Sequence, residues 1–293
     1  MKIKILTSIF IISVLNILAG FLIKDKMYFI FTCFIGTSIG VILLYKWMLS
    51  PINQMAKRLT QIEEENCRVE NMRKEFVANV SHELRTPLTS ISGFIETLQA
   101  GAAEDPEARN RFIEIIAIET ARLKRLIQDI LVLSDIESKI EINDCEFSSR
   151  EVVYSVVELL EPIASSKEIS MKIEFTTDII LKGNQDKFTQ MLVNLVENAI
   201  KYSNDNGHVT ISGHENANEI VFAVDDDGIG IAPNDLDRIA ERFYRVDKSR
   251  SKKVGGTGLG LSIVKHTAAL FNGELVVTSK LGSGSKFSIV IKK

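Results

Sequence analysis

The chain has 293 residues, of which 45% are hydrophobic and 25% are charged, enough to bury the core of one or two globular domains. Its formal net charge is −3, which argues against nucleic acid as a partner, because nucleic-acid-binding domains usually carry a basic excess. The three cysteines, Cys33, Cys67 and Cys145, lack CxxC spacing and predict neither a disulfide framework nor a zinc site.

Two apolar segments without charged residues, Ile5–Ile23 and Met27–Tyr45, stand at the start of the chain. Each is long enough, as a helix, to cross a hydrocarbon core about 30 Å thick. Only Lys24–Lys26 separates them, so we expect a two-helix transmembrane hairpin over residues 1–45. A cleaved signal peptide is the alternative for the first segment, because lysines precede it, but its apolar stretch is long for that role.

Basic residues orient this hairpin. The larger basic excess follows the second apolar segment, and basic residues favour the cytoplasmic side of a membrane. These residues are Lys46, Lys57, Arg58, Arg68, Arg73 and Lys74. We therefore expect a multi-pass protein of the cell membrane with two spans, whose N-terminus and remaining domains lie in the cytoplasm.

The next segment, residues 46–75, is polar but keeps a seam at alternating steps of three and four residues. The seam positions are Ile52, Met55, Leu59, Ile62, Asn66, Val69, Arg73, Phe76 and Val80. This spacing predicts a coiled-coil signalling linker, in which a buried Asn66 can fix a two-stranded register. The alternative is a single amphipathic helix on the membrane surface.

Residues 76–140 carry two amphipathic patterns, separated by a break at Gly101–Pro106. Each pattern places apolar residues on one face of a helix. The first set is Val77, Val80, Leu84, Leu88, Ile91, Ile95 and Leu98, and the second is Phe112, Ile116, Leu123, Leu126, Ile130 and Leu133. Two helices with one apolar stripe each predict a hairpin that dimerises into a four-helix bundle.

His82, within "NVSHELRTPLTS", projects from the first of these helices about 155° away from the middle of the apolar stripe. Asn79, Thr86 and Thr89 share its side of the helix. A histidine that only filled the core would lie within the stripe. The pattern therefore predicts a displayed imidazole, whose neutral form is nucleophilic near pH 7.

Beyond residue 141 the pattern changes to strands mixed with helices. The predicted strands are 169–175, 208–215, 219–226, 273–279 and 285–293, and the predicted helices are Ser149–Lys167, Asn184–Tyr202 and Thr257–Phe271. Because the late strands can return as a hairpin, we expect an α/β sandwich over residues 141–293 rather than a doubly wound sheet.

Three clusters in this domain indicate a nucleotide site. Asn194, Asn198 and Lys201 recur at steps of four and three, so they share one face of a helix. "DDDGIGI" (225–231) and "GGTGLGLSIVK" (255–265) are glycine-rich turns, the second opening a helix whose first amides can hold phosphate. Each cluster alone is weak evidence, because a glycine-rich turn is as often an ordinary loop and acid-rich strand ends are common on protein surfaces.

Five motifs in order resemble the orthodox sensor histidine kinases of two-component systems, most closely the phosphate-regulon sensor subgroup. "SHELRTPL" is similar to the H-box, "NLVENAIKYS" to the N-box, "DDDGIG" to the first glycine box, "ERFYRVDKSRS" to the F-box and "GGTGLGL" to the second glycine box. The resemblance implies a helical dimerisation and phosphotransfer domain over 76–140, and an ATP-binding domain of the GHKL (Bergerat) type over 141–293.

The resemblance implies roles for three residues of the H-box. His82 would accept the γ-phosphoryl group of ATP on Nε2, and Glu83 would accept the other ring proton and hold the tautomer. Thr86 would position a water molecule that dephosphorylates a response regulator. The alternative for Thr86 is a local cap on the turn before Pro87.

The resemblance also assigns the nucleotide pocket, with ATP and Mg²⁺ as its ligands. Asn198 would coordinate Mg²⁺ with support from Asn194, Lys201 would face phosphate and Tyr202 would lie against adenine. Asp226 would accept the adenine amino group, with its neighbour Asp225 as the alternative. The remaining implied pocket residues are Gly228, Gly230, Arg245, Lys248, Gly256, Thr257, Gly258, Leu259 and Gly260; Arg245 would contact the γ-phosphate.

Lys248 belongs to a basic stretch with Arg250, Lys252 and Lys253 that is interpreted as a mobile lid; a solvated loop is the alternative. Related folds that hydrolyse nucleotide carry a glutamate where Asn194 stands. An amide cannot activate water, so the phosphoryl group is expected to go to His82.

The chain departs from most members of the resembling family in its sensing parts. The loop between the two apolar segments has three residues, and Met48–Arg73 is too short for a complete HAMP module. We therefore expect the spans, or a membrane partner protein, to supply the signal to a homodimer whose partner is a response regulator receiver domain. The alternative is a membrane scaffold that binds ATP without catalysis.

Overall fold

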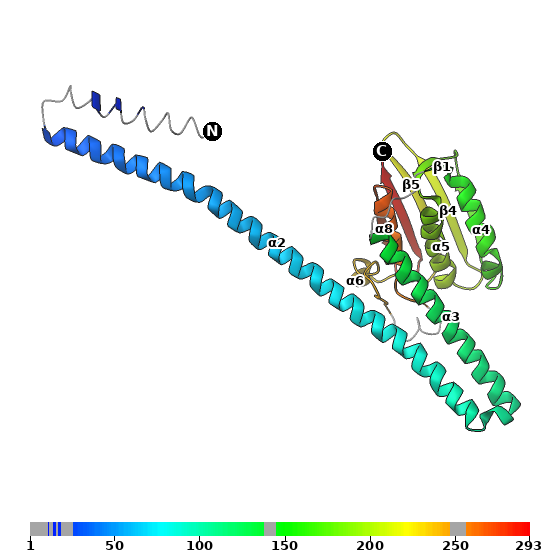
Figure 1. Cartoon of the computed structure of the whole chain (residues 1–293). Coiled ribbons are helices and arrows are strands. Elements are labelled where there is room, and N and C mark those ends of the chain that lie inside the picture. The colour runs from blue at the N-terminus through cyan, green and yellow to red at the C-terminus, as the bar shows by residue number, and fades with distance from the viewer. Residues whose placement is uncertain (1–10, 12–13, 16, 19–25, 138–144, 247–255) are drawn as a thin grey trace. The chain divides into compact units, whose positions relative to one another are not determined.

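The computed structural model describes residues 26–137, 145–246 and 256–293, together with residues 11, 14, 15, 17 and 18. The chain divides into two compact units, Met1–Glu75 and Phe76–Lys293. The predicted first span, Ile5–Ile23, lies mostly outside the described residues. The ribbon in Figure 1 shows the order of the elements along the chain.

The helix α2 (Lys26–Gln99) supplies most of the first unit and continues into the second. Among the described residues, one helix is long and apolar enough to cross a membrane, and the qualifying segment is Cys33–Gln99. The helix continues through Pro51. The second apolar segment, the linker and the first amphipathic pattern therefore form one helix, which contains both Pro51 and Pro87.

The second unit begins with a helical hairpin formed by the end of α2 and by α3 (Pro106–Glu137), with the short 3₁₀ helix η1 (Ala102–Glu104) between them. Gly101 ends α2 in the left-handed region at φ 117°, where glycine has no Cβ penalty. The Oδ1 atom of Asp105 then accepts a hydrogen bond from the backbone amide of Glu107. The predicted break at Gly101–Pro106 is confirmed.

The remainder is an α/β sandwich, as predicted. Its sheet has the strand order β2-β4-β5-β7-β6, in which only β2 and β4 pair in parallel. The strands are β2 (Ser170–Phe175), β4 (His208–Glu215), β5 (Glu219–Asp226), β6 (Gly273–Ser279) and β7 (Ser285–Lys292). Each predicted strand is present, with bounds that differ by one residue at most.

Helices α4 (Ser149–Ser165), α5 (Gln185–Tyr202) and α8 (Gly260–Leu270) form one layer, in which α5 contacts both α4 and α8. Four aromatic rings pack within the core between helices and sheet: Phe147, Phe188, Phe222 and Phe271. Burying each contributes roughly 2–3 kcal/mol to stability. This core fixes the helices against the sheet.

Among the described residues of this domain, three short elements escaped prediction: β1 (Cys145–Ser148) and β3 (Ile180–Gly183), which pair antiparallel, and the helix α6 (Pro233–Leu236). Strands of this length give too few alternating positions for a periodicity to register. A helix of a single turn, such as α6, likewise has too few residues to show a helical period.

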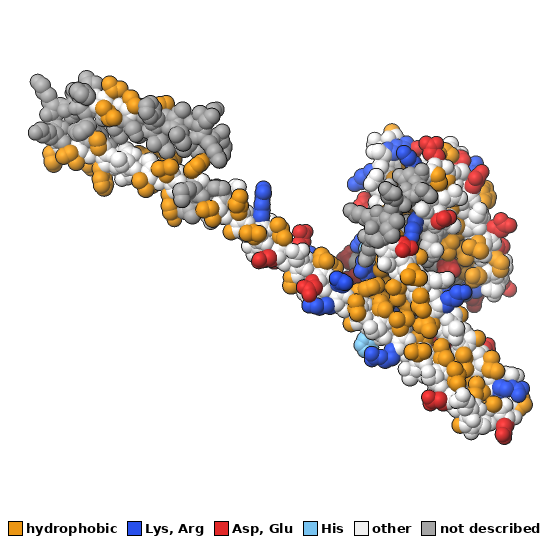
Figure 2. All heavy atoms as spheres, viewed as in Figure 1, with side chains coloured by type: hydrophobic (Ala, Val, Ile, Leu, Met, Phe, Trp, Pro, Cys, Tyr) orange, Lys and Arg blue, Asp and Glu red, His pale blue; other side chains and the backbone are white. Residues whose placement is uncertain are grey.

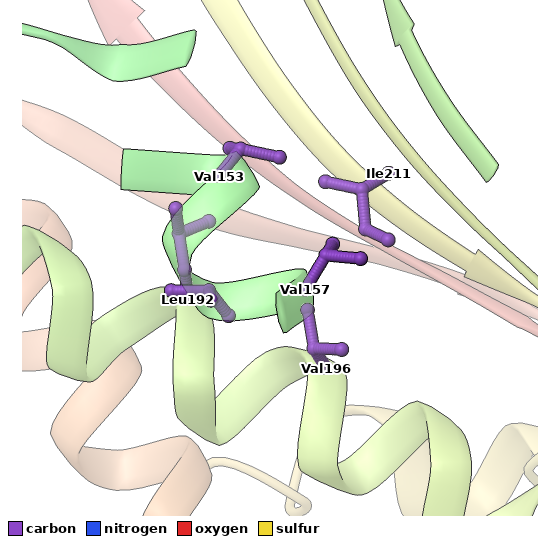
Figure 3. A pocket seen from close by; sticks show the side chains of 6 residues that line it. Val153, Val157, Leu192, Val196 and Ile211 are labelled. Atoms are coloured by element: carbon purple, nitrogen blue, oxygen red, sulfur yellow. The ribbon is translucent and has the colours of Figure 1, made fainter. Parts of the chain in front are cut away.

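Valine, leucine and isoleucine side chains of α4, α5 and β4 meet at one small gap in this core (Figure 3). The lining residues are Val153, Val156, Val157, Leu192, Val196 and Ile211. The gap has no room for a water molecule, so this part of the core is close-packed and is not a ligand site.

Candidate nucleotide and phosphoacceptor site

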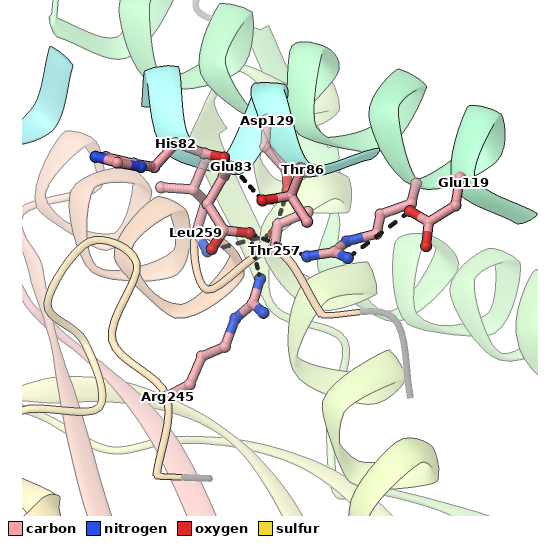
Figure 4. A network of polar contacts seen from close by, with 9 residues as sticks. His82, Glu83, Thr86, Glu119, Asp129, Arg245, Thr257 and Leu259 are labelled. Carbon is pink, nitrogen blue, oxygen red and sulfur yellow. Dashed lines mark hydrogen bonds and ion pairs between the residues drawn. The ribbon is translucent and has the colours of Figure 1, made fainter. Parts of the chain in front are cut away.

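His82 is exposed on α2, as its position opposite the apolar stripe predicted. Figure 4 shows its ring directed away from the carboxylate of Glu83. The hydroxyl of Thr86 donates a hydrogen bond to the backbone carbonyl of His82 over 3.2 Å. The structure therefore displays the imidazole, and it ties Thr86 locally to the same turn of helix.

Glu83 points toward two arginines. Its Oε2 atom lies 3.0 Å from Arg122 on α3 and 3.4 Å from Arg245 of the F-box segment (Figure 4). In the described part of the chain, no hydrogen bond joins this carboxylate to the ring of His82. The predicted role of Glu83 toward the His82 ring stays a prediction, and the observed partners are cationic.

The ligand face of α5 is set by its buried face. The buried residues recur at helical spacing and leave the other side of α5 free: Phe188, Met191, Leu192, Leu195, Val196, Ala199 and Ile200. Asn194, Asn198 and Lys201 consequently share a half-buried polar face. The predicted alignment of these three residues is confirmed, while their ligands stay a prediction.

Asn194 and Lys201 carry two signs of an anionic ligand. The Nδ2 atom of Asn194 is buried and has no hydrogen-bond partner among the described residues. Burial, and then the charges of Arg125 and Arg245, lower the pKa of Lys201 to about 8. A buried unpaired donor and a crowded ammonium group both gain from a nearby phosphate.

Asp226 ends β5 and is buried, whereas Asp225 is exposed. Burial raises the pKa of Asp226 to about 6, although the Gly228 amide donates to its Oδ1 atom over 3.0 Å. This difference in burial favours Asp226 over Asp225 as the acceptor of the adenine amino group.

Glycines of the first glycine box bring backbone close to α5 and to the β6–β7 turn. A Cβ atom at Gly228 would lie 2.3 Å from the carbonyl oxygen of Tyr202. Gly230 has φ 65°, and a Cβ atom there would lie 2.0 Å from the carbonyl oxygen of Lys280. Neither position can hold another residue without moving backbone.

The second glycine box lies at the start of α8, next to α5. A Cβ atom at Gly256 would meet the Lys201 ammonium at 2.8 Å, and one at Gly260 would lie 3.9 Å from the side-chain amide of Asn194. Gly258 between them has φ 75°. The predicted site residues of α5 and of this loop are therefore brought together. Lys248 lies outside the described residues.

The same loop also contacts the hairpin. The Thr257 hydroxyl donates to the Asp129 Oδ2 atom over 2.6 Å. Leu259 is fully buried in a cluster with Leu126, Ile136 and Ile263. Burial raises the pKa of Asp129, while the hydrogen bond from Thr257 opposes the rise.

Sequence reasoning missed two polar residues of α3, Arg122 and Asp129. Arg122 stands four residues before Leu126 of the apolar stripe, which places it on the inward side of the helix. The sequence signal for Arg122 was therefore a charged residue on the apolar side of a helix. Asp129 directly precedes Ile130 of the same stripe, and nothing in the local pattern distinguishes it from a surface acid.

The site suits ATP together with Mg²⁺. The unpaired amide of Asn194, the Lys201 ammonium and the close backbone at Gly228 form a polar cradle of the kind that phosphates and adenine occupy. No group of three or more His, Cys, Asp or Glu side chains gathers as a metal site in the described part of the chain. Mg²⁺ commonly takes one or two protein oxygens plus substrate phosphates. The side-chain oxygen of Asn198 could provide one of these protein ligands.

Comparison with known proteins agrees with this assignment. Residues 72–139 match the His Kinase A (phospho-acceptor) domain, and residues 183–293 match the histidine kinase-, DNA gyrase B- and HSP90-like ATPase family. The sensor-like histidine kinase SenX3 of Mycolicibacterium smegmatis is 40% identical over 230 residues. The chain belongs to the sensor histidine kinase family. The narrower likeness to the phosphate-regulon subgroup stays a prediction.

Other members of the family show how much of each protein is shared. The chain is 39% identical to sensor histidine kinase WalK of Bacillus subtilis, with 78% of this chain and 38% of WalK aligned. For SenX3 the aligned shares are 78% and 60%. For sensor histidine kinase YclK of Bacillus subtilis the identity is 36%, and the shares are 87% and 52%. The chain thus spans between 38% and 60% of the length of these relatives.

Two solved structures share the architecture of the family. Histidine kinase AdeS of Acinetobacter baumannii has TM-score 0.58 and 25% identity, covering 72% of this chain and 97% of AdeS. Histidine kinase ThkA in complex with response regulator protein TrrA has TM-score 0.61 and 27% identity, covering 75% of this chain and 61% of that one.

Proposed function

We propose that the chain is a membrane-bound histidine kinase that phosphorylates its own His82 from ATP and passes the phosphoryl group to an aspartate of a response regulator. The observation that carries the proposal is an exposed imidazole on a helical hairpin within one compact unit that also holds the polar cradle of α5 and α8. The family membership supports the same reaction.

In the proposed reaction, the lone pair of His82 Nε2 attacks the γ-phosphorus of ATP. A phosphorus–nitrogen bond forms, the bond to the β,γ-bridging oxygen breaks, and ADP leaves with the electron pair. Before the attack, Glu83 would accept a hydrogen bond from the other ring nitrogen, Nδ1–H, which leaves the lone pair on Nε2. As the phosphorus–nitrogen bond forms and the ring becomes positive, Glu83 would accept the Nδ1 proton. Mg²⁺ held by Asn198, when bound, neutralises charge on the phosphates.

Arg245 and Lys201 supply positive charge for this step. The Arg245 side chain is 7% exposed and Lys201 is half-buried, and burial lowers the pKa of Lys201 to about 8. Charges in such a setting interact strongly with phosphate oxygens. Asn194 cannot act as a base toward water, which favours phosphoryl transfer over hydrolysis.

The protein is proposed to act as a homodimer. Apolar residues of the linker seam are exposed in the single chain: Ile52, Met55, Leu59, Ile62 and Val69. Apolar residues of the hairpin are exposed as well: Val77, Leu88, Ile95, Ile113, Ile118, Ile127 and Leu131. Hydrophobic side chains gather over the hairpin helices α2 and α3 in Figure 2. A second copy would bury both sets in a coiled coil and a four-helix bundle.

The second half of the proposal concerns partners and location. The receiver domain of a response regulator would dock at the exposed His82, and Thr86 would position a water molecule for the reverse, phosphatase reaction. Two N-terminal spans would anchor the kinase domains on the cytoplasmic side. Their short connection favours a signal from within the membrane, through the spans or a membrane partner protein.

The decisive experiment uses the full chain in lipid nanodiscs with γ-labelled ATP. We expect a label that is lost in acid and kept in base, as a phosphohistidine is, and that is absent from His82→Gln. Binding of a fluorescent ATP analogue should survive in this variant, because His82 lies outside the α5–α8 cradle. Label that persists in His82→Gln would move the acceptor to another residue.

A further inference from the structure

Arg122 is a charged side chain inside the helical hairpin. It is only 8% exposed, and a charge in such a place is strongly destabilising unless it is paired. Its Nη2 atom lies 3.0 Å from Glu83 on α2, and its Nη1 atom lies 3.8 Å from Glu119 on α3. The planar guanidinium thus spans two carboxylates and links the helices of the hairpin.

The partner of Arg122 is the residue next to the phosphoacceptor. The same Oε2 atom of Glu83 also lies 3.4 Å from Arg245, so one carboxylate oxygen is shared by two arginines. Arg122 belongs to α3 of the hairpin that carries His82, whereas Arg245 follows β5 in the F-box segment. Figure 4 shows Arg245 reaching toward Glu83. The two arginines can therefore part from Glu83 independently.

We propose that Arg122 is a positioning residue for Glu83, holding its carboxylate beside His82 when Arg245 leaves it for the γ-phosphate. This inference rests on the proposed function, in which Arg245 serves ATP and Glu83 serves the ring of His82. Once Arg245 has moved, Glu83 would otherwise be a half-buried carboxylate without a cation, free to turn into solvent. The observed partners of Arg122 are Glu83 and Glu119 rather than the imidazole, so it would act through Glu83.

A purely structural role for Arg122 predicts a different outcome. If the ion pair only joined α2 to α3, its loss would weaken the hairpin and lower activity whatever residue stood at position 83. A positioning role predicts that the loss matters only while Glu83 is present. A double-mutant cycle separates the two roles.

The cycle compares Arg122→Met, Glu83→Gln and the double variant in the full chain in nanodiscs. The measurements are the single-turnover rate of His82 labelling at saturating ATP and the Kd of a fluorescent ATP analogue. We expect Arg122→Met to lower the rate by about tenfold, as loss of a positioning group usually does, and to leave Kd within about twofold. The double variant should match Glu83→Gln alone.

Two further variants keep the test interpretable. Arg122→Lys retains the positive charge but lacks the planar guanidinium that can bind two carboxylates, so it should recover part of the rate. It also replaces Arg122→Met in the cycle if that variant misfolds. Lys124→Met removes an exposed charge from the same helix and should leave the rate unchanged. Losses that multiply in the double variant, or equal losses in Arg122→Lys and Arg122→Met, would overturn the proposal.

Failure of the inference and failure of the proposed function look different. If the unmodified chain is not labelled on His82, the proposed function fails. If it is labelled and Glu83→Gln is slow, but Arg122→Met is as fast as the unmodified chain, only the positioning role fails. A normal rate in Glu83→Gln would likewise remove the role of Arg122.

Discussion

Asp226 illustrates how a proposed binding residue can work against folding. Burial raises its pKa from 3.8 to about 6, so near neutral pH the folded protein holds a carboxylate in a place that favours the neutral acid. Because the folded-state pKa is the higher one, the stability that this group contributes is complete below about pH 3.8. It is lost as pH rises through about 6.

We therefore expect Asp226→Asn to raise stability and to lose nucleotide binding. At pH 8 the free energy of unfolding should rise by roughly 1–3 kcal/mol, and the gain should shrink as pH falls toward 4. Thermal unfolding at pH 8 and pH 4 measures the difference in stability between Asp226→Asn and the unmodified chain. Asp225→Asn, at the exposed neighbour, is the matched control and should show neither effect. A variant at 226 that is less stable at pH 8 would contradict the argument.

Thr86 poses a second question at the level of one residue. Its hydroxyl donates to the backbone carbonyl of His82 over 3.2 Å, a local bond that fits a cap on the turn before Pro87. A hydroxyl one turn after His82 can also orient water. Both interpretations use the same atom, so a measurement must separate them.

Thr86→Ala should keep His82 labelling within a few-fold and slow regulator dephosphorylation by about tenfold or more, since a positioning group is lost. Thr86→Ser keeps the hydroxyl and should retain most of the phosphatase rate. The assay follows release of phosphate from a purified, phosphorylated response regulator. Equal losses of labelling and phosphatase activity would show that Thr86 is structural.

Elements with strong periodicity were predictable from the sequence, and contacts between elements were not. The buried positions of α5 and the alternation in β4 and β5 fix which side chains face the core. Asn194, Asn198 and Lys201 therefore had to share the opposite face. The pairing of Glu83 with Arg122, and of Thr257 with Asp129, depends on packing between distant segments, which no local pattern encodes.

In the proposed site, the polar face of α5 would also set a pH limit on nucleotide binding. The pKa of Lys201 is lowered to about 8, first by burial and then by Arg125 and Arg245. The ammonium form is present below this value and is lost as pH rises through it. A bound phosphate would favour the charged form, so binding above pH 8 must take up a proton.

We expect the Kd of an ATP analogue to rise by roughly tenfold between pH 7 and pH 9. At pH 9, one unit above the pKa of Lys201, only about a tenth of the Lys201 side chains is still protonated. In Lys201→Met the affinity should be lower throughout, with this part of the pH dependence removed. Lys187→Met, near the other end of α5, is the control and should keep the wild-type profile. The measurement is the Kd of the ATP analogue, titrated at several pH values. If the Kd of Lys201→Met depends on pH as in the wild type, the titrating group is another residue.

For the whole molecule, the informative feature is the continuity of α2. One helix runs from Lys26 to Gln99 and contains the apolar window, the linker seam and His82. Seam residues such as Leu59 and Ile62 are more than half exposed in the single chain, which favours a partner helix along the linker. Within the dimer proposed above, the register of this seam would link events in the membrane to His82.

Changing the phase of the linker tests this link. Inserting one residue between Asn66 and Cys67 rotates the downstream helix by about 100° relative to the upstream part. Inserting seven residues lengthens the same helix but restores the seam to within about 20°. We expect the single insertion to change the rate of His82 labelling in nanodiscs by about fivefold or more, a common coupling between distant sites. The seven-residue insertion should stay near the wild-type rate. Because the two variants differ mainly in phase, equal rates would mean that the linker transmits no register, and equally large changes would mean that length, rather than packing, carries the signal.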